Sequence, residues 1–389
     1  MEGVTDFATR LWMAQTAAPD EATTPFLRVT KDYPSKRISA NFLPEIELSK
    51  EHGVVSCVPQ LMASETPDLI RIGEYFLKSV PFIDINCGCP SPTVVGHGAG
   101  SSLLQSPEKF HRYLSEVVSA LGGEHVSVKM RVGFLDEGEF PALLDVLRSF
   151  PLARLTIHGR TRTDRYRGLA RWAHMDLASR QLACPVVGSG DVLSLESFDE
   201  KMKEAPCLAG VIVGRGALRN PWLFRQLRQG KDRVVVSRSL VKARMLQFVL
   251  LQELQQQHWE SFFKTVRDGF FNLGNELSGS EAEERNELLA AKIFNGVERE
   301  CLAAVLWPVS RVSLARGKML WNYLRSGLNA PPELSVAILR APDWLTFLNA
   351  LDAFLEHLSA EDVAVGYHRE WDWVYSGAGS TIQDSREIT

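Results

Sequence analysis

The sequence has no run of about 18 or more consecutive apolar residues, the length that a membrane-spanning helix requires. Its first residues, MEGVTDFATRLW, lack a positively charged segment followed by an apolar one, so we expect no secretory signal. The formal net charge is only −4 over 389 residues, which excludes a globally basic nucleic-acid binder but leaves a locally basic face open. We therefore expect a folded, monomeric, cytoplasmic protein with no membrane segment.

Cysteine is scarce, and no C-x-x-C pair occurs among the six residues Cys57, Cys87, Cys89, Cys184, Cys207 and Cys301. The C-x-C spacing of Cys87 and Cys89 has no matched second pair of Cys or His, so we expect no metal site. Reduced thiols fit the cytosolic expectation. The sequence also lacks G-x-G-x-x-G at the start of a helix after the first strand, which disfavours an open dinucleotide-binding sheet.

What the first part of the chain does contain is an alternation of apolar, β-rich runs with segments of helical period. The runs predict buried strands at 26–30, 54–62, 82–87, 126–132, 153–159, 185–190 and 209–215. The segments between them predict helices at 66–79, 107–121, 138–149, 171–181, 194–204 and 216–228. Near-continuous apolar strands separated by helices indicate a parallel sheet. Seven units and a stub at residues 1–4 favour an α/β protein with a (β/α)8 TIM barrel whose first strand is truncated.

Beyond about residue 235 the strand signal stops, and the pattern predicts packed helices at 238–260, 281–297, 309–326, 333–339 and 343–358. We therefore expect a barrel domain over 1–232, a helical domain over 233–360 and a C-terminal tail over 361–389.

In a barrel, the C-terminal ends of the strands build the active site. Two glycine-rich ends, Ser189-Gly190-Asp191 and Gly214-Arg215, follow the last two expected strands, where barrels commonly bind phosphate. Lys129 is costly to bury within an apolar strand, so we expect it to face the mouth beside that phosphate. A cation there could stabilise a reduced flavin. His158, taken alone, is more often a hydrogen-bonded core histidine.

Cys89 follows a strand, on a loop shaped by Gly88 and Pro90. By itself such a cysteine is more often a small buried hydrophobe. At the catalytic face it could instead be a proton donor or a nucleophile. Cys87 is still within the strand and is expected to pack.

Basic residues gather in two places. One set includes Arg160 and Arg162, and the other includes Arg316, Lys318 and Arg325 between Trp321 and Tyr323. Solvated helix faces with salt bridges would explain both sets. Binding of RNA phosphates by these basic residues, with bases stacked on the aromatic side chains, would explain them equally well.

The chain resembles the tRNA-dihydrouridine synthase family in segments that occur in the family's order across most of residues 1–230. They are MEGVTD, QLMAS, DINCGCPSPTVVGHGAGSSLL, VSVKMRVG, LTIHGRTR, GSGDV and GVIVGRGALRNPWL. The segments NCGCPS, FLRV and ARGKMLWNYLR are most similar to the bacterial C-type enzymes, which carries the resemblance into the helical domain.

The resemblance implies FMN bound in an eight-stranded barrel, NADPH as reductant, and reduction of a D-loop uridine of tRNA, with position 16 as the candidate target. It implies that Cys89 protonates the base and that Asn86 helps to hold it. The implied cofactor contacts are Met1, Glu2, Gln60, Lys129, His158, Ser189, Gly190, Asp191, Gly214 and Arg215. The implied tRNA contacts include Arg160, Arg162, Arg316, Lys318 and Arg325.

The sequence departs from the family pattern in four ways. It lacks the strand and Ala-Pro that usually precede Met-Glu-Gly, Ser189 replaces an Asn, Pro25 replaces a Glu before Phe26, and the helical part is longer. Pro25 leaves the target position open. Two other functions are left open as well: a flavin barrel that reduces a small pyrimidine or enone, and a tRNA-binding protein without catalysis.

Overall fold

The structure, a computed structural model, describes residues 4–17, 19–31, 33–34, 38, 42–43, 45–47, 55–231, 234–257, 309–325, 328, 332–358 and 362–365. Met1, Glu2, the expected helix at 281–297 and most of residues 255–305 lie outside the described residues. Contacts divide the chain into one unit of Met1–Asp84, Val192–Asp199 and Val213–Gly366 and a second of Ile85–Asp191, Glu200–Ile212 and Tyr367–Thr389. The expected boundary near residue 232 stays a prediction.

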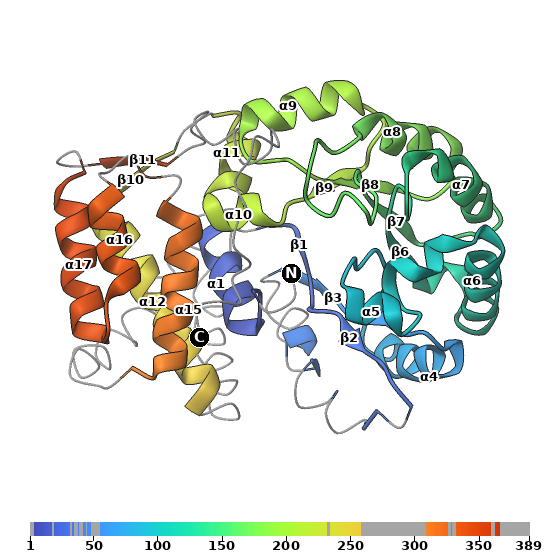
Figure 1. The fold of residues 1–389 in the computed structure, drawn as a ribbon, viewed down its shortest axis with the longest axis horizontal. Helices are drawn as coiled ribbons and strands as arrows, with labels where there is room; N and C mark the ends of the chain where they lie inside the picture. The colour runs from blue at the N-terminus through green and yellow to red at the C-terminus, as the bar shows by residue number, and fades with distance from the viewer. Residues whose placement is uncertain are drawn as a thin grey trace, which may run out of the picture. The chain divides into compact units, whose positions relative to one another are not determined.

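The expected parallel sheet is present (Figure 1). Seven strands lie in the order β2 (Leu27–Arg28), β4 (Gln60–Met62), β5 (Ile83–Cys87), β6 (Val126–Arg131), β7 (Arg154–His158), β8 (Val186–Ser189) and β9 (Gly210–Ile212). Every pairing whose register is known in this sheet is parallel. From β4 to β9, neighbours in the sheet are also consecutive strands along the chain, as in the wall of an α/β barrel.

One expected strand is broken at proline, and one short strand was not expected. The expected strand at 54–62 forms β3 (Ser56–Val58) before Pro59 and β4 after it. Proline has no N–H to donate to a ladder, which explains this break. The unexpected strand β1 (Glu21–Thr23) lies before Pro25 and pairs with β3 in parallel as a separate two-stranded sheet, whereas the expected strand at 26–30 forms only β2.

The helices of this region match the expected segments, except that the single helix expected at 216–228 is divided into two around Pro221. They are α4 (Thr66–Leu77), α6 (Pro107–Leu121), α7 (Phe140–Arg148), α8 (Trp172–Gln181), α9 (Leu195–Glu204), α10 (Arg215–Arg219) and α11 (Leu223–Gln229). In α6, the Ser106 side chain accepts a hydrogen bond from the Lys109 N–H, Pro107 occupies the first turn and Gly122, at φ +84°, follows the last residue. These are the start and stop signals that sequence reasoning uses.

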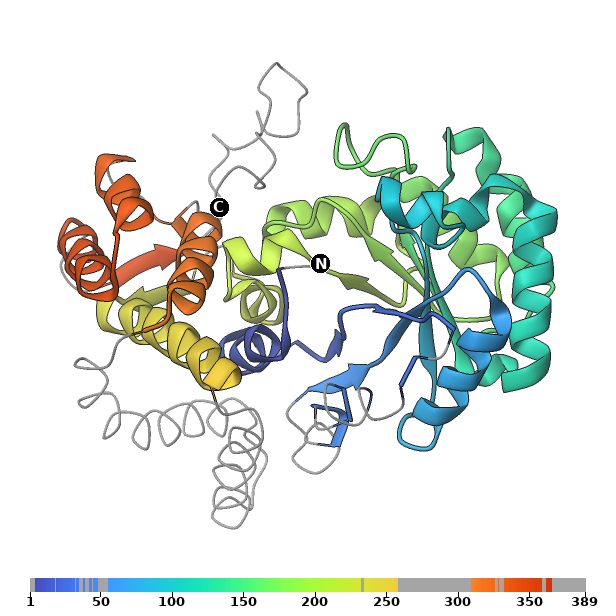
Figure 2. The ribbon, with the colours of Figure 1, turned by 60° about the horizontal axis from the view of Figure 1, so that its bottom comes forward.

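In the second unit the two faces of the sheet differ in chemistry. Val128, Leu155, Ile157 and their neighbours on one face are fully buried, and a Cβ added at Gly188 would lie 2.6 Å from the Trp172 ring of α8. Helices α6, α7 and α8 follow one another along the outside of these strands (Figure 2). The alternate positions therefore point to the opposite, inner face.

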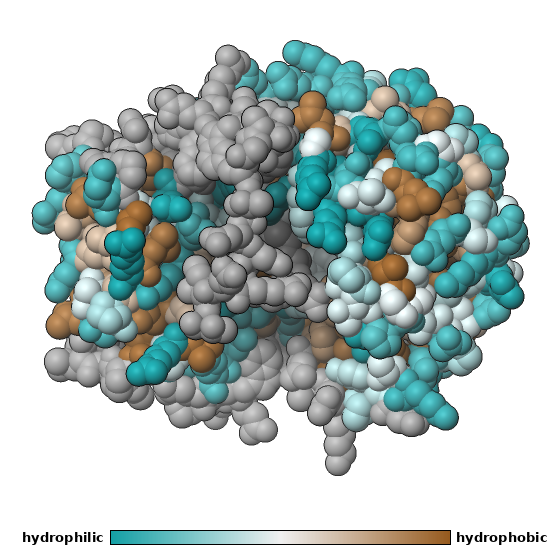
Figure 3. Space-filling model, in the orientation of Figure 1, coloured by the Kyte–Doolittle hydropathy of each residue, from teal (hydrophilic) through white to brown (hydrophobic). Residues whose placement is uncertain are grey.

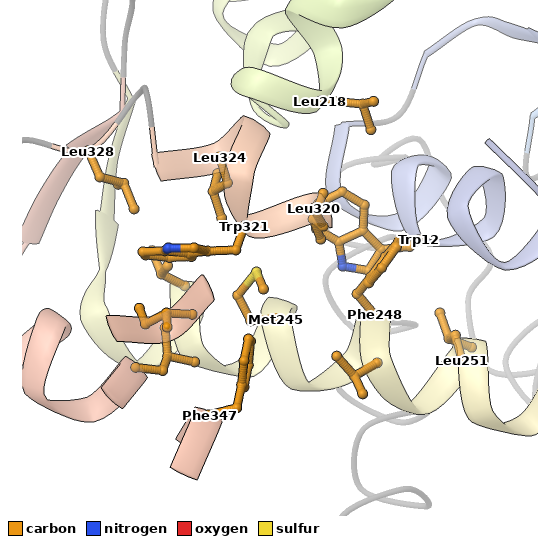
Figure 4. Packing of buried hydrophobic residues seen from close by; sticks show 14 of the residues in the cluster. Trp12, Leu218, Met245, Phe248, Leu251, Leu320, Trp321, Leu324, Leu328 and Phe347 are labelled. Carbon is orange, nitrogen blue, oxygen red and sulfur yellow. The ribbon is translucent and has the colours of Figure 1, made fainter. Parts of the chain in front are cut away.

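The first unit holds the helical region, with α1 (Phe7–Ala17), α12 (Arg238–Gln257), α15 (Arg311–Leu324), α16 (Pro332–Arg340) and α17 (Trp344–Glu356). Trp12 packs edge-to-face on Phe248 at 5.5 Å, and Trp321 on Phe354 at 4.7 Å. The core formed by α1, α12, α15 and α17 is continuous (Figure 4). The expected helices at 238–260, 309–326, 333–339 and 343–358 are confirmed, whereas α1 was not anticipated.

One small element contradicts the expectation that strands end near residue 235. β10 (Val234–Ser237) pairs antiparallel with β11 (Asp362–Val365), which lies in the segment expected to be a tail.

Two short helices, α5 (Pro92–Gly96) and the 3-10 helix η1 (Gly100–Gln105), follow β5. On the face seen in Figure 3, the described residues show small groups of hydrophobic side chains among hydrophilic ones. None of the described helices is long and apolar enough to cross a membrane.

Candidate functional site

Cys89 lies two residues beyond β5, and its backbone is held by the side chain of Asn86. The Asn86 Oδ1 accepts hydrogen bonds from the N–H groups of Gly88 and Cys89, both at 3.0 Å. The oxygen of Asn86 therefore shapes the turn that presents Cys89. Cys89 is half-buried, whereas Cys87 is completely buried in the strand, as expected for a packing residue.

Arg131, at the end of β6, joins this turn to the loop after β7. Its Nε donates to the Gly88 carbonyl at 2.9 Å, and its Nη1 donates to the carbonyls of Thr161 at 2.8 Å and Arg165 at 3.0 Å. Burial lowers the pKa of Arg131 to about 10, so the side chain stays charged at neutral pH. Sequence reasoning assigned no role to Arg131. The sequence did contain a clue to its placement: Arg131 lies two residues after Lys129, so both cations are on one face of the strand.

The strand register aligns the remaining polar side chains of the second unit. Arg131 pairs with His158, and His158 pairs with Ser189, so these three lie in one row across β6, β7 and β8. Lys129 pairs with Thr156 in the next row. The Thr156 hydroxyl is buried and has no hydrogen-bond partner among the described residues. The inner face thus offers cations, an imidazole and hydroxyls side by side.

The segment after β8 turns sharply. Gly190 has φ +133°, and Asp191 has φ +54°, which is the left-handed region that non-glycine residues rarely adopt. The Asp191 carboxylate accepts from Arg160 Nη2 at 2.7 Å and from the Ala170 N–H at 2.7 Å. Its side chain is thereby fully engaged. Any contribution of Asp191 to an anion site would come from its backbone N–H.

Three of the expected cofactor positions that the structure describes, Gln60, Gly214 and Arg215, lie in the first unit. Gln60 is buried, and its Nε2 donates to the buried Asp84 at 2.7 Å. Gly214 immediately precedes α10, which begins at Arg215. A Cβ at the next glycine, Gly216, would lie 2.2 Å from the Val192 carbonyl, so only glycine permits this close approach.

The sequence matches the family model described as dihydrouridine synthase over residues 1–304. The chain belongs to the dihydrouridine synthase family. It is 36% identical to a probable tRNA-dihydrouridine synthase of Aquifex aeolicus over 44% of this chain and 55% of that protein. It is 32% identical to a tRNA-dihydrouridine(16) synthase of Cupriavidus necator over 59% of this chain and 71% of that protein.

Among solved structures, an old yellow enzyme homologue of Zymomonas mobilis is similar at a TM-score of 0.42 and 13% identity, over 59% of this chain and 85% of that chain. The expectation of a dihydrouridine synthase with a parallel α/β fold and a following helical region is confirmed. The family is one of flavin-dependent oxidoreductases, so the chain is an enzyme of that class.

Two residues expected to contact tRNA are engaged inside the protein. Arg160 is 0% exposed, and it donates to Asp191 and to the carbonyls of Arg167 and Gly168. A fully buried guanidinium cannot reach an RNA backbone, so the structure corrects this expectation. Arg160 instead joins the loop after β7 to the turn after β8.

Arg316 is the second such residue. Its Nη2 donates to the Val4 carbonyl at 2.8 Å and to Asp6 at 2.9 Å, and its Nε donates to Gln252 at 3.2 Å. The side chain is 16% exposed, and it ties α15 to the start of α1. The structure therefore gives Arg316 a structural role in place of the expected surface contact.

The other expected tRNA residues keep some exposure. Lys318 donates to the Ala341 carbonyl after α16, and Arg325 is half-buried at the end of α15. The Arg162 guanidinium lies 4.9 Å from the Phe134 ring centroid. Among the described residues, no group of three or more His, Cys, Asp and Glu side chains could hold a metal ion.

Proposed function

We propose that the chain is an FMN-dependent, NADPH-driven enzyme that reduces a D-loop uridine of tRNA to 5,6-dihydrouridine. The observation that carries this proposal is the placement of Cys89 on a turn that Arg131 anchors to the polar inner face of β6 and β7. The relatives quoted above are named for tRNA-dihydrouridine synthesis, one of them at position 16. We propose the same target position, acting in the cytoplasm as a monomer.

The residues present fit a flavin mononucleotide. Lys129 and His158 supply a cation and an imidazole on the inner face, and the buried Thr156 hydroxyl still has hydrogen-bonding capacity there. Backbone N–H groups in the turn at Gly190 and Asp191 would bind the FMN phosphate. Ser189, in the same row as His158, would add a hydroxyl contact, while Gln60, Gly214 and Arg215 stay predictions from the sequence. When bound, the flavin would supply the hydride that reduces uracil C6.

The remaining chemistry belongs to Cys89. Once a hydride reaches C6, the electron pair at C5 requires a proton, and the Cys89 thiol would donate it. An ordinary thiol is largely protonated at neutral pH and can serve as a general acid. The charged Arg131 side chain donates to the carbonyl of Gly88, next to Cys89, and would help to stabilise the thiolate that proton donation leaves behind. Solvent would return the proton, and NADPH would supply the two electrons.

The loop after β7 is the surface that we propose for tRNA in the second unit. Arg162, Arg165 and Arg167 project from it with Tyr166, whose exposed fraction is 52%. No ion pair forms with Arg165 or Arg167 among the described residues, whereas the neighbouring acids Asp164 and Glu137 both pair with Arg171. Exposed arginines beside an exposed aromatic ring suit phosphates and an unstacked base. In the helical region, Lys318 and Arg325 are the corresponding candidates.

Two measurements test the proposal. The ligand released from purified protein by denaturation is expected to have the mass of FMN. In tRNA from cells that lack the gene, dihydrouridine is expected to disappear from position 16, and the parent gene but not Cys89→Ala is expected to restore it. Bound flavin with unchanged tRNA in the deletion strain would favour a small-molecule reductase. Protein that binds tRNA without flavin would indicate a non-catalytic role.

A further inference from the structure

The 3-10 helix η1 (Gly100–Gln105), which follows the short helix α5, lies next to Cys89. One of its residues, Ser101, bonds to Cys89 through both its backbone N–H and its side chain. Ser101 donates two hydrogen bonds to the Cys89 carbonyl, from its N–H at 3.2 Å and from its hydroxyl at 2.8 Å. Ser101 is completely buried. A pair of donors on one carbonyl fixes the orientation of that peptide more firmly than one bond would.

Gly100 brings η1 this close to the cysteine. Its φ is +60°, and an added Cβ would lie 3.0 Å from the Cys89 Cβ, 3.1 Å from the Cys89 carbonyl oxygen and 2.8 Å from a Val94 methyl. Any side chain at position 100 would therefore push against the cysteine itself. Glycine is required here both for its backbone angle and for the space it leaves.

The peptides around Cys89 are thus held from three directions. Asn86 accepts from the N–H of Cys89, Arg131 donates to the Gly88 carbonyl, and Ser101 donates to the Cys89 carbonyl. Asn86 and Arg131 come from strands of the sheet, whereas Ser101 comes from a segment twelve positions along the chain. Of these three residues, only Ser101 bonds to the carbonyl of Cys89, the backbone group on the C-terminal side of the thiol-bearing residue.

We propose that Ser101 is a positioning residue for Cys89, which sets where the thiol meets the base without touching the substrate itself. This inference rests on the proposed function, in which Cys89 is the proton donor. Small errors in the position of a reacting group are costly, and a displacement of about 1 Å can slow a step by as much as 10²-fold. Loss of the Ser101 hydroxyl is therefore expected to slow protonation while leaving the reduction of flavin by NADPH unchanged.

Ser102 supplies a matched control. It is the next residue of η1, it is also buried, and its hydroxyl donates to the Ala99 carbonyl at 2.9 Å without reaching Cys89. Ser101→Ala and Ser102→Ala each remove one buried hydroxyl that bonds a backbone carbonyl of the same segment. A merely structural role would give the two variants similar effects.

The experiment is a double-mutant cycle with Cys89→Ala, read as single-turnover reoxidation of the reduced flavin by tRNA. Ser101→Ala is expected to slow reoxidation about 10- to 100-fold in the parent. In the Cys89→Ala background the same change is expected to have less than about a twofold effect, because no thiol remains to be positioned. Ser102→Ala is expected to stay within about twofold of the parent in both backgrounds.

A readout independent of turnover is the rate at which iodoacetamide alkylates Cys89, followed by peptide mass spectrometry in the oxidised enzyme. Ser101→Ala is expected to change this rate and Ser102→Ala to leave it unchanged. If Ser101→Ala does not yield folded flavoprotein, Ser101→Cys, whose thiol is somewhat larger than the hydroxyl but a much weaker donor, replaces it in the cycle.

Equal slowing by Ser101→Ala in the parent and in Cys89→Ala would overturn the positioning role while leaving Cys89 as the acid. A parent-like rate in Ser101→Ala would do the same. Undiminished activity of Cys89→Ala alone would remove the proposed proton donor, and the positioning role with it.

Discussion

Asp6 and Arg316 are 310 positions apart in the sequence, yet the Arg316 guanidinium donates to the Asp6 carboxylate at 2.9 Å. Asp6 precedes α1 and accepts from the N–H and the hydroxyl of Thr9, so it caps that helix. Arg316 belongs to α15 and also holds the Val4 carbonyl. The pair therefore fixes the segment directly after Met1 and Glu2, two residues proposed to contact the flavin, against the helical region.

Replacing Asp6 by Asn is expected to lower the free energy of unfolding by about 1–3 kcal/mol at neutral pH, the range for a hydrogen-bonded charge. Burial alone would raise the pKa of Asp6, but Arg316, Thr9 and Gln252 outweigh it and lower the pKa below the usual value. Because the pKa is lower in the folded state, this stabilisation is complete above the unfolded value of about 3.9 and is lost as the pH falls through the folded value.

Urea unfolding of Asp6→Asn and parent protein at a series of pH values measures this difference. It should be largest near neutrality and shrink toward zero in acid. Arg311→Met, which changes an exposed arginine on the same helix, is the control and should cost little. A deficit for Asp6→Asn that persists unchanged at the lowest pH would contradict the assigned ion pair.

Breaking the buried ion pair of Arg160 and Asp191 is expected to reduce the free energy of unfolding more than Asp6→Asn does. Asp191→Asn would leave the 0% exposed Arg160 without its counter-charge, and breaking a buried pair in this way costs about 3–5 kcal/mol. Thermal unfolding should show the loss, together with lower flavin content because the turn after β8 would relax. Arg180→Met breaks an exposed pair with Asp176 and should cost far less, because solvent screens exposed charges. Similar losses of stability in Asp191→Asn and Arg180→Met would contradict the difference expected between a buried and an exposed ion pair.

Much of the barrel region could be predicted because its signals are local. Apolar runs, helix caps and glycines predicted the strands and helices between residues 54 and 230 within a few residues. The break of the expected strand at Pro59 could have been predicted from the missing N–H of proline, but it was not. The pairing of β10 with β11 depends on segments more than 120 positions apart, and no local pattern predicts such a contact.

The candidate site, too, could be predicted from the sequence only in part. The positions of Cys89, Lys129 and His158 follow from strand ends and alternation. The roles of Arg160 and Arg316 could not be predicted, because an arginine that faces an RNA and one that binds internal carbonyls and carboxylates look alike in sequence. Their partners, Asp191 and Asp6, lie 31 and 310 positions away. Ser101 was hidden for the same reason, since its bond to Cys89 depends on the path of the intervening chain.

Lys129 tests the proposed cofactor site. Lys129→Met removes a cation from the inner face and is expected to weaken flavin binding about tenfold, equivalent to about 1.4 kcal/mol, or to slow its reduction by a similar factor. Lys129→Arg keeps the charge and should retain most of both properties. Fluorescence titration of the apoprotein with FMN and stopped-flow reduction by NADPH measure the two quantities. Parent-like behaviour of Lys129→Met in both assays would exclude Lys129 from the flavin site.

The central claim is that Cys89 donates the proton that completes reduction of the base. The most direct test is single-turnover reoxidation of NADPH-reduced enzyme by tRNA that lacks dihydrouridine, with Cys87→Ala as the control for a buried cysteine of the same segment. Cys89→Ala is expected to bind FMN and tRNA and to be reduced at the parent rate, while reoxidation falls by roughly 10²–10⁴-fold, the range for loss of a general acid. Reoxidation of Cys89→Ala at the parent rate would contradict the account.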